Sequence, residues 1–139
     1  MATLIDSSVL IGLERRGLGL VALPQIMAED EELALAAVTV SELLLGVYRA
    51  DAPARRLRRE SFLDALLETI PVLAFDLRVA RTYGRVWSEL LAQGRPIGVH
   101  DAQIAATALT HGYSVLTDNV RDFQKVPGLS TTAPRWPSG

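Results

Sequence analysis

Short apolar runs in this 139-residue chain alternate with longer segments in which apolar residues recur every three or four positions. The short runs are typical of buried strands, and the longer segments are typical of helices that pack one face against a sheet. Where the two alternate, each helix carries the chain back across the sheet, so that successive strands run parallel. The pattern therefore predicts a three-layer α/β protein.

The expected elements follow from these runs and from the residues that bound them. Strands are expected at residues 3–5, 33–38, 72–75 and 113–117, and helices at residues 7–15, 39–50, 54–68, 77–92 and 100–111, with a further helical piece between residues 20 and 31. Asp76 is placed to cap the helix 77–92, and Gly94 and Gly112 to end helices. In the helix 77–92 the apolar spacing of three and four is followed by Leu77, Ala80, Gly84, Trp87 and Leu91.

The length and composition indicate one globular domain spanning residues 1–139. Hydrophobic residues make up 49% of the chain and charged residues 22%, which is too apolar for a disordered protein. Residues 127–139 are rich in turn-forming residues and are expected to form a loosely ordered tail. The absence of cysteine excludes disulfides and thiolate-bound metals, so any metal must be held by oxygen or imidazole.

The N-terminal segment and the net charge bear on where the protein is located and on what its surface attracts. The first apolar run is interrupted by Asp6 and has no basic region before it, so it resembles neither a signal peptide nor a membrane span. We therefore expect a cytoplasmic location without membrane association. The net charge of −2 argues against strong nonspecific attraction of the whole surface to nucleic acid.

Acidic residues stand where the expected strands end or helices begin. Asp6 ends the first strand, Glu42 lies in the first helical turn after the second, Asp101 opens the helix 100–111, and Asp118 ends the fourth strand. Ligands of open parallel sheets bind at the carboxyl ends of the strands, where residues distant in sequence converge. We therefore predict that these four carboxylates meet in one crevice.

Each of these acids also has a purely structural explanation, because acids commonly cap helices and build turns. Glu42, for example, fits a capping box with Thr39, and Asp118 with Asn119 fits a turn. A cluster of four carboxylates without a counterion would be costly, since each raises the pKa of the others. Taken together, the four positions favour a site for a divalent cation.

The donor set selects the cation and its chemistry. Carboxylate oxygens favour Mg²⁺, with Mn²⁺ as a possible substitute, and Mg²⁺ usually keeps several water molecules. A water activated by such a cation attacks phosphorus, while the cation neutralises charge on the phosphate. His100 adjoins Asp101, but a lone histidine makes a poor argument for zinc or for a general base, so an exposed surface position is favoured.

Three segments resemble the PIN-domain family: LIDSSVLI at residues 4–11, TVSELLLGV at 39–47 and HDAQIAATALTHGYSVLTDNVRDF at 100–123. Their order and spacing are similar to those of the VapC-type toxins of bacterial toxin-antitoxin pairs. The resemblance implies an α/β/α fold with a mostly parallel sheet of four or five strands. It also implies a metal-dependent ribonuclease that hydrolyses RNA, is often a homodimer, and is inhibited by a cognate antitoxin protein.

The resemblance also carries over individual site residues. Asp6, Glu42 and Asp101 match the first three acidic positions of the family, which are catalytic and metal-binding. The fourth position stays open between three residues, ranked Asp118, then Asn119, then Asp122.

Hydroxyl and arginine residues supply the rest of the expected site. Ser7, Ser8 and Thr117 resemble small hydroxyl residues of the family, and they either orient ligands and phosphate or cap helices and turns. Arg121, beside the acidic turn, is the best candidate for a phosphate contact. Other arginines, such as those at positions 55, 56, 58 and 59, more plausibly form a solvated helix face.

Two other functions use the same residues. A structure-selective DNA nuclease has similar acids, but it usually needs extensions that hold the duplex, and a chain of 139 residues has little room for them. A non-catalytic RNA-binding module, in which the acids only cap helices, is disfavoured by the intact set of Asp6, Glu42 and Asp101.

Overall fold

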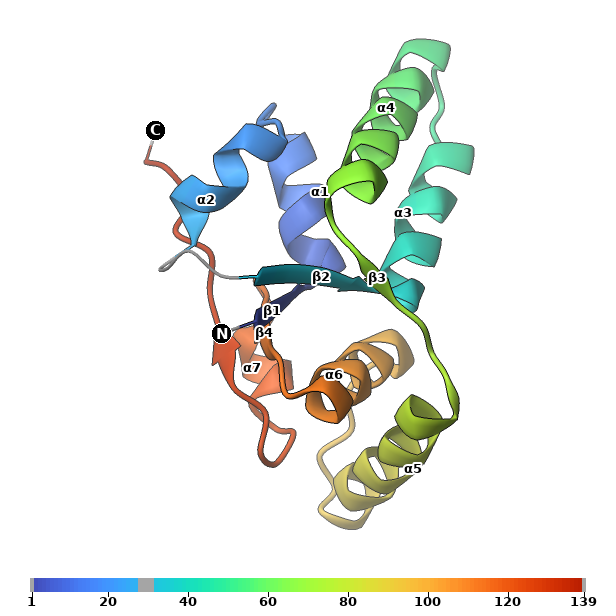
Figure 1. The fold of residues 1–139 in the computed structure, drawn as a ribbon, viewed down its shortest axis with the longest axis vertical. Helices are drawn as coiled ribbons and strands as arrows, with labels where there is room; N and C mark the ends of the chain where they lie inside the picture. Colours follow the sequence, from blue (N-terminus) through green and yellow to red (C-terminus); the bar gives the residue numbers. More distant parts are fainter. Residues whose placement is uncertain (1, 28–31, 139) are drawn as a thin grey trace.

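The computed structural model describes residues 2–27 and 32–138, and it shows a central sheet with helices on both faces (Figure 1). The five strands are β1 (Ala2–Ile5), β2 (Glu32–Ala36), β3 (Val72–Leu73), β4 (Ser114–Leu116) and β5 (Thr131–Thr132). They run in the order β3-β2-β1-β4-β5, and every pairing is parallel. The predicted parallel α/β sheet is thus confirmed, with β1 at its centre.

The helices form the two outer layers. On one side of the sheet lie α1 (Ser7–Arg15), α2 (Leu23–Ile26) with a preceding 3₁₀ turn (Leu20–Ala22), α3 (Ala37–Tyr48) and α4 (Pro53–Thr69). On the other side lie α5 (Leu77–Ala92), α6 (Val99–His111) and α7 (Val120–Phe123), as Figure 1 shows. Among the described residues, none of these helices has both the length and the apolar character needed to cross a bilayer.

Alternation along the strands divides the core into two apolar clusters. Leu4 and Val115 belong to the cluster beneath α5, α6 and α7, whereas their neighbours Ile5 and Leu116 belong to the cluster beneath α1, α2 and α4. All four side chains are at most 2% exposed. Because successive side chains of a strand point to opposite faces, the three-layer fold needs apolar residues at consecutive positions.

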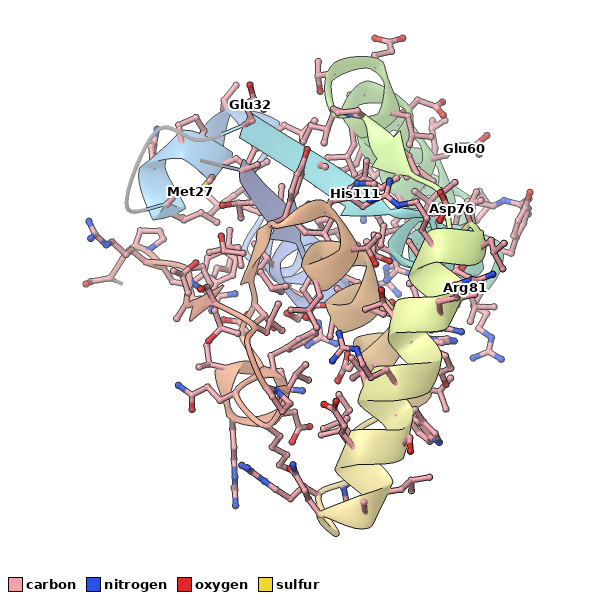
Figure 2. The ribbon with its side chains drawn as sticks, turned by 60° about the horizontal axis from the view of Figure 1, so that its bottom comes forward. Met27, Glu32, Glu60, Asp76, Arg81 and His111 are labelled. Atoms are coloured by element: carbon pink, nitrogen blue, oxygen red, sulfur yellow. The ribbon has the colours of Figure 1, made fainter. Side chains whose placement is uncertain are left out.

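Local end signals operate as the sequence predicted. Asp76 caps α5, since its Oδ1 accepts a hydrogen bond from the backbone N–H of Val79 at 3.0 Å. Figure 2 shows Asp76 at the first turn of this helix. Gly94 and Gly112, which follow α5 and α6, have φ angles of 63° and 71°, a left-handed conformation that glycine adopts without strain.

Some predicted boundaries and faces are wrong. The second strand ends at Ala36 rather than Val38, so Glu42 is the sixth residue of α3 and lies beyond its first turn. The N-cap of α3 is Ala36, which rules out the capping box proposed for Thr39 and Glu42. In α5 the buried residues are Val79, Val86 and Leu90, whereas Leu77 and Leu91 of the predicted stripe are 67% and 57% exposed.

The C-terminal segment has defined structure that the sequence did not indicate. Within residues 127–139, expected to form a loosely ordered tail, β5 pairs with β4, and the chain then runs alongside α2 (Figure 1). There the backbone N–H of Arg135 donates to the carbonyl of Ile26 at 2.7 Å. The helical piece expected at residues 20–31 is present as the 3₁₀ turn and α2, and its last part, residues 28–31, lies outside the described residues.

Candidate active site

The site lies at the carboxyl ends of β1 and β4, the two strands at which the strand order of the sheet reverses. From β1 the chain builds the sheet outward through β2 and β3, and it then crosses to the other side of β1 to form β4 and β5. At such a switch point the connecting segments leave neighbouring strands in opposite directions and open a crevice between them. Asp6 follows β1 at this point, and Thr117 follows β4.

Asp6 is a buried carboxylate with one satisfied oxygen and one free oxygen. Its side chain is 2% exposed, and its Oδ2 accepts hydrogen bonds from Ser8 Oγ at 2.7 Å and from Thr117 Oγ1 at 2.8 Å. Its Oδ1 has no hydrogen-bond partner among the described residues. A buried anionic oxygen without a partner is expensive, so this atom is suited to bind a cation.

Glu42 joins three helices at the edge of the same crevice. Its Oε1 accepts a hydrogen bond from Ser7 Oγ of α1 at 3.1 Å, and its Oε2 lies 3.3 Å from Nδ1 of His100 in the first turn of α6. Both partners stand beside acidic site residues, Ser7 next to Asp6 and His100 next to Asp101. Glu42 therefore enters the site from α3 even though it lies beyond the first turn of that helix.

Asp101 completes the cluster from the first turn of α6. Burial, the negative charge of Asp6 and then the charges of Glu42 and Asp122 raise its pKa from an ordinary value of 3.8 to about 6, against a hydrogen bond from Asn119 that lowers it. Burial is the largest of these causes, and the rest of the upward shift comes from carboxylates within electrostatic reach of Asp101. Asp101 is thus within electrostatic reach of Asp6 and Glu42, and the three residues remain the predicted members of one site.

The three candidates for the fourth position have different contacts in the structure. Asp118 is exposed, and its Oδ1 accepts a hydrogen bond from Nε1 of Trp136 at 2.8 Å. Asp122 instead faces the cluster, because Nδ2 of Asn119 donates to Oδ2 of Asp101 and to Oδ2 of Asp122, each at 3.1 Å. The hydrogen bonds from Asn119 and from Lys125 lower the pKa of Asp122.

The predicted hydroxyl residues all contact the acids or the adjoining turn. Ser7 and Ser8 donate to Glu42 and Asp6, respectively. Thr117 Oγ1 donates to Asp6 and also accepts a hydrogen bond from the backbone N–H of Asn119 at 2.9 Å. These contacts favour the orienting role over helix capping. Arg121 is exposed on the short helix α7, one residue before Asp122.

The donor set fits a hard divalent cation. Among the residues that the structure describes, no three His, Asp or Glu side chains are arranged so that together they could hold one metal ion. The available donors are nonetheless those that Mg²⁺ prefers, namely the free Oδ1 of Asp6 and the carboxylates of Asp101 and Glu42. A cation would also remove the repulsion that raises the pKa of Asp101.

Two contacts at the site were missed by sequence reasoning. Trp136 lies in a proline-containing segment without apolar periodicity, so nothing local indicated that it would reach Asp118. Lys125 lies 3.0 Å from Oδ1 of Asp122, and its position three residues further along a helical turn is a signal that could have been used.

The fold and the site define the chain as a three-layer α/β protein with a carboxylate cluster at the switch point of a parallel sheet. Residues 3–129 match the PIN domain family. Because this match covers most of the chain, the protein belongs to the PIN-domain family, as the resemblance of its sequence motifs implied.

Relatives and solved structures agree with this placement. The chain is 37% identical over 129 residues to ribonuclease VapC1 of Rickettsia felis, covering 93% of each sequence. It is 34% identical over 100 residues to the tRNA(fMet)-specific endonuclease VapC of Shigella flexneri, covering 72% of this chain and 74% of that one. It also superposes on the structure of VapBC-5 from Mycobacterium tuberculosis, a member of the VapBC family of toxin-antitoxin systems. That match has a TM-score of 0.74 at 28% identity and covers 97% of this chain and 98% of the other.

Proposed function

We propose that this protein is the toxin of a toxin-antitoxin pair and acts as a Mg²⁺-dependent endoribonuclease. The proposal rests on the environment of Asp6, a buried carboxylate whose Oδ1 has no hydrogen-bond partner among the described residues. The pKa of Asp101 is raised by burial and by the negative charge of Asp6. Such an arrangement is unfavourable without a cation and favourable with one. VapC relatives named as ribonucleases supply the class of reaction.

The chain's own residues divide into those that hold the cation and those that hold the ligands in place. Asp6, Glu42 and Asp101 would bind Mg²⁺, or Mn²⁺ in its place. Asp122, which shares the side-chain amide of Asn119 with Asp101, would add a fourth negative charge nearby. When bound, the cation would make a water molecule more acidic and neutralise charge on the phosphodiester. Thr117, Ser8 and Ser7 keep the carboxylates oriented through the hydrogen bonds described above.

RNA is the proposed substrate, and the charge of the protein is compatible with it. The chain carries a net charge of −2, so one bound divalent cation makes it formally neutral. Exposed Arg121 beside the cluster is the proposed phosphate contact, since guanidinium binds phosphate through two hydrogen bonds. A cognate antitoxin is part of the proposal because the chain resembles a VapBC toxin-antitoxin structure. The homodimer and the cytoplasmic location expected from the sequence complete it.

The decisive experiment compares single carboxylate-to-amide variants on a fluorogenic RNA, with and without Mg²⁺. Asp6→Asn and Asp101→Asn should each reduce Mg²⁺-stimulated cleavage at least about 100-fold, because each removes a metal ligand. Asp64→Asn, which changes an exposed acid of α4, is the matched control and should cleave normally. Unchanged circular dichroism would show that the fold is intact.

Three results would contradict the proposal. Cleavage of RNA that is insensitive to Asp6→Asn would remove the assigned site. Cleavage of branched DNA in preference to RNA would identify a structure-selective DNA nuclease instead. Binding of RNA without any Mg²⁺-stimulated cleavage would identify a non-catalytic module.

A further inference from the structure

The C-terminal segment is connected to the candidate active site through a side chain that the proposed function does not use. Trp136 lies on the same side of the sheet as α1 and packs against the apolar cluster there. Its Nε1 donates to Oδ1 of Asp118, which stands one residue after Thr117. The segment that was expected to be a loosely ordered tail is thus hydrogen-bonded to the turn that follows β4.

The ring of Trp136 is held closely against α1. A Cβ atom placed on Gly12 would lie 2.6 Å from Cζ2 and 2.8 Å from Cη2 of the ring, so only glycine permits this approach. On the ring, the guanidinium carbon of Arg16 lies 3.8 Å from the centroid, in cation–π contact. Because helix, ring and arginine pack together, the indole N–H has a defined direction.

Hydrogen bonds continue from Trp136 to Asp6. Asp118 accepts from Trp136 at 2.8 Å, and the backbone N–H of Asp118 donates to Ser8 Oγ at 3.1 Å. Ser8 Oγ in turn donates to Asp6 Oδ2 at 2.7 Å. We call the three residues Trp136, Asp118 and Ser8 the tail bridge.

We propose that the tail bridge positions Asp6 for cation binding, and that Asp118 acts in it as a hydrogen-bond acceptor rather than as a metal ligand. Trp136 fixes the Asp118 turn, the turn fixes the Ser8 hydroxyl, and the hydroxyl holds Oδ2 of Asp6. The carboxylate is thereby kept in the rotation that leaves Oδ1 free. The inference rests on the proposed function, because it assigns Trp136 and Asp118 as positioning residues of the proposed cation site.

Three substitutions separate the acceptor role of Asp118 from a ligand role. Trp136→Phe keeps an aromatic ring and removes the N–H, Asp118→Ala removes the acceptor, and Asp118→Asn keeps an acceptor oxygen but removes the charge. Trp87→Phe, at a partly buried tryptophan of α5 on the other side of the sheet, is the matched control. Binding of Mn²⁺ without RNA is measured by electron paramagnetic resonance, and kcat and KM are measured with a fluorogenic RNA.

If the tail bridge positions Asp6, Trp136→Phe and Asp118→Ala should each weaken Mn²⁺ binding about fivefold and lower kcat more than they change KM. Asp118→Asn should restore most of the Mn²⁺ affinity lost in Asp118→Ala, and Trp87→Phe should bind Mn²⁺ as the unmodified protein does. Equal loss in Asp118→Asn and Asp118→Ala would show that the charge is needed and would overturn the proposal. Normal Mn²⁺ binding by Trp136→Phe would overturn it as well.

A double-mutant cycle tests the coupling independently of cation binding and cleavage. The free energy of unfolding of the metal-free protein is measured for Trp136→Phe, Asp6→Asn and the double variant. Non-additive effects are expected, because the two residues share one chain of hydrogen bonds, whereas Trp87→Phe with Asp6→Asn should be additive. Additivity in both cycles would overturn the tail bridge. Coupling without Mg²⁺-stimulated cleavage would retain the bridge as a structural connection and reject the proposed function.

Discussion

Oγ1 of Thr117 donates a hydrogen bond to Oδ2 of Asp6 over 2.8 Å, and so links the residues that follow the neighbouring strands β1 and β4. Both side chains are buried, at 0% and 2% exposure. The contact crosses 111 positions of the sequence and exists because the chain returns to the other side of β1. It connects the second half of the fold directly to the side chain of the first acidic residue.

Removal of the Thr117 hydroxyl should therefore impair catalysis more than a comparable change elsewhere. Thr117→Val keeps the shape of the side chain but leaves Oδ2 of Asp6 with Ser8 alone. We expect RNA cleavage to fall about tenfold and the free energy of unfolding to fall by about 1–3 kcal/mol. Steady-state kinetics and urea unfolding measure the two effects.

The matched control for this prediction is Thr107→Val. Thr107 is also buried, and within the described part of the chain its Oγ1 donates to the carbonyl of Gln103 in the same helix, α6. It should lose stability without a tenfold loss of cleavage. Equal kinetic effects of the two substitutions would show that the Thr117 contact has no special relation to the site.

Asp101 should make the stability of the metal-free protein depend on pH. A carboxyl group whose pKa rises on folding binds its proton more tightly in the folded state, so the folded protein carries more protons between about pH 4 and pH 6. The free energy of unfolding should therefore fall as pH rises through this window, by at most about 3 kcal/mol. Urea unfolding in the presence of a chelator measures the slope.

Asp101→Asn tests the origin of that slope. The amide cannot ionise, so the metal-free variant should be more stable than the unmodified protein at pH 7.5 while losing cleavage. A variant less stable than the unmodified protein at pH 7.5, with the slope between pH 4 and pH 6 unchanged, would mean that another group titrates there.

Magnesium should stabilise the folded protein. A ligand that binds only the folded state at ten times its Kd adds about 1.4 kcal/mol to the free energy of unfolding. We therefore expect Tm to rise with Mg²⁺ and to fall again when a chelator is added. Asp6→Asn should remove most of this rise, since it removes the free Oδ1 donor, and Ca²⁺ serves as a comparison of cation size. An equal Tm rise in Asp6→Asn would place the cation elsewhere.

Gly12→Ala should dislodge the C-terminal segment. The new methyl group would overlap the ring of Trp136, and because the overlapped atoms belong to a rigid indole, the ring must move. We expect a loss of about 1–3 kcal/mol in the free energy of unfolding and greater exposure of Trp136 to a fluorescence quencher. Gly84→Ala lies in α5, where the added carbon would meet no described atom within 4 Å outside the adjacent residues and the helix backbone, and it should instead gain about 0.5–1 kcal/mol. Matching losses in the two variants would contradict the close contact.

The sequence sufficed for features that depend on near neighbours. The apolar runs predicted four of the five strands, and Asp76, Gly94 and Gly112 marked helix ends correctly because capping and left-handed turns involve only a few adjacent residues. The positions of Asp6 and Asp101 at element boundaries were predictable for the same reason.

The buried face of α5 and the strand β5 depend instead on which helices and strands pack against one another. The helix α5 carries two apolar stripes, and the stripe with Val79, Val86 and Leu90 is buried because α6 lies against it, which no pattern within α5 reveals. The strand β5 has only two residues and is defined by its pairing with β4 rather than by an apolar run of its own.

The sequence by itself determined that the chain is a parallel α/β protein and which acids stand at the ends of its elements. Periodicity and capping depend on residues that lie close together in the sequence. Only the tertiary structure decided how those acids are used. Asp118 and Asp122 are four positions apart in one turn-rich segment, yet Asp118 pairs with Trp136 and Asp122 with Asn119. The physical reason is that the direction of a side chain at a turn depends on the strands and helices packed around it, which come from distant parts of the chain.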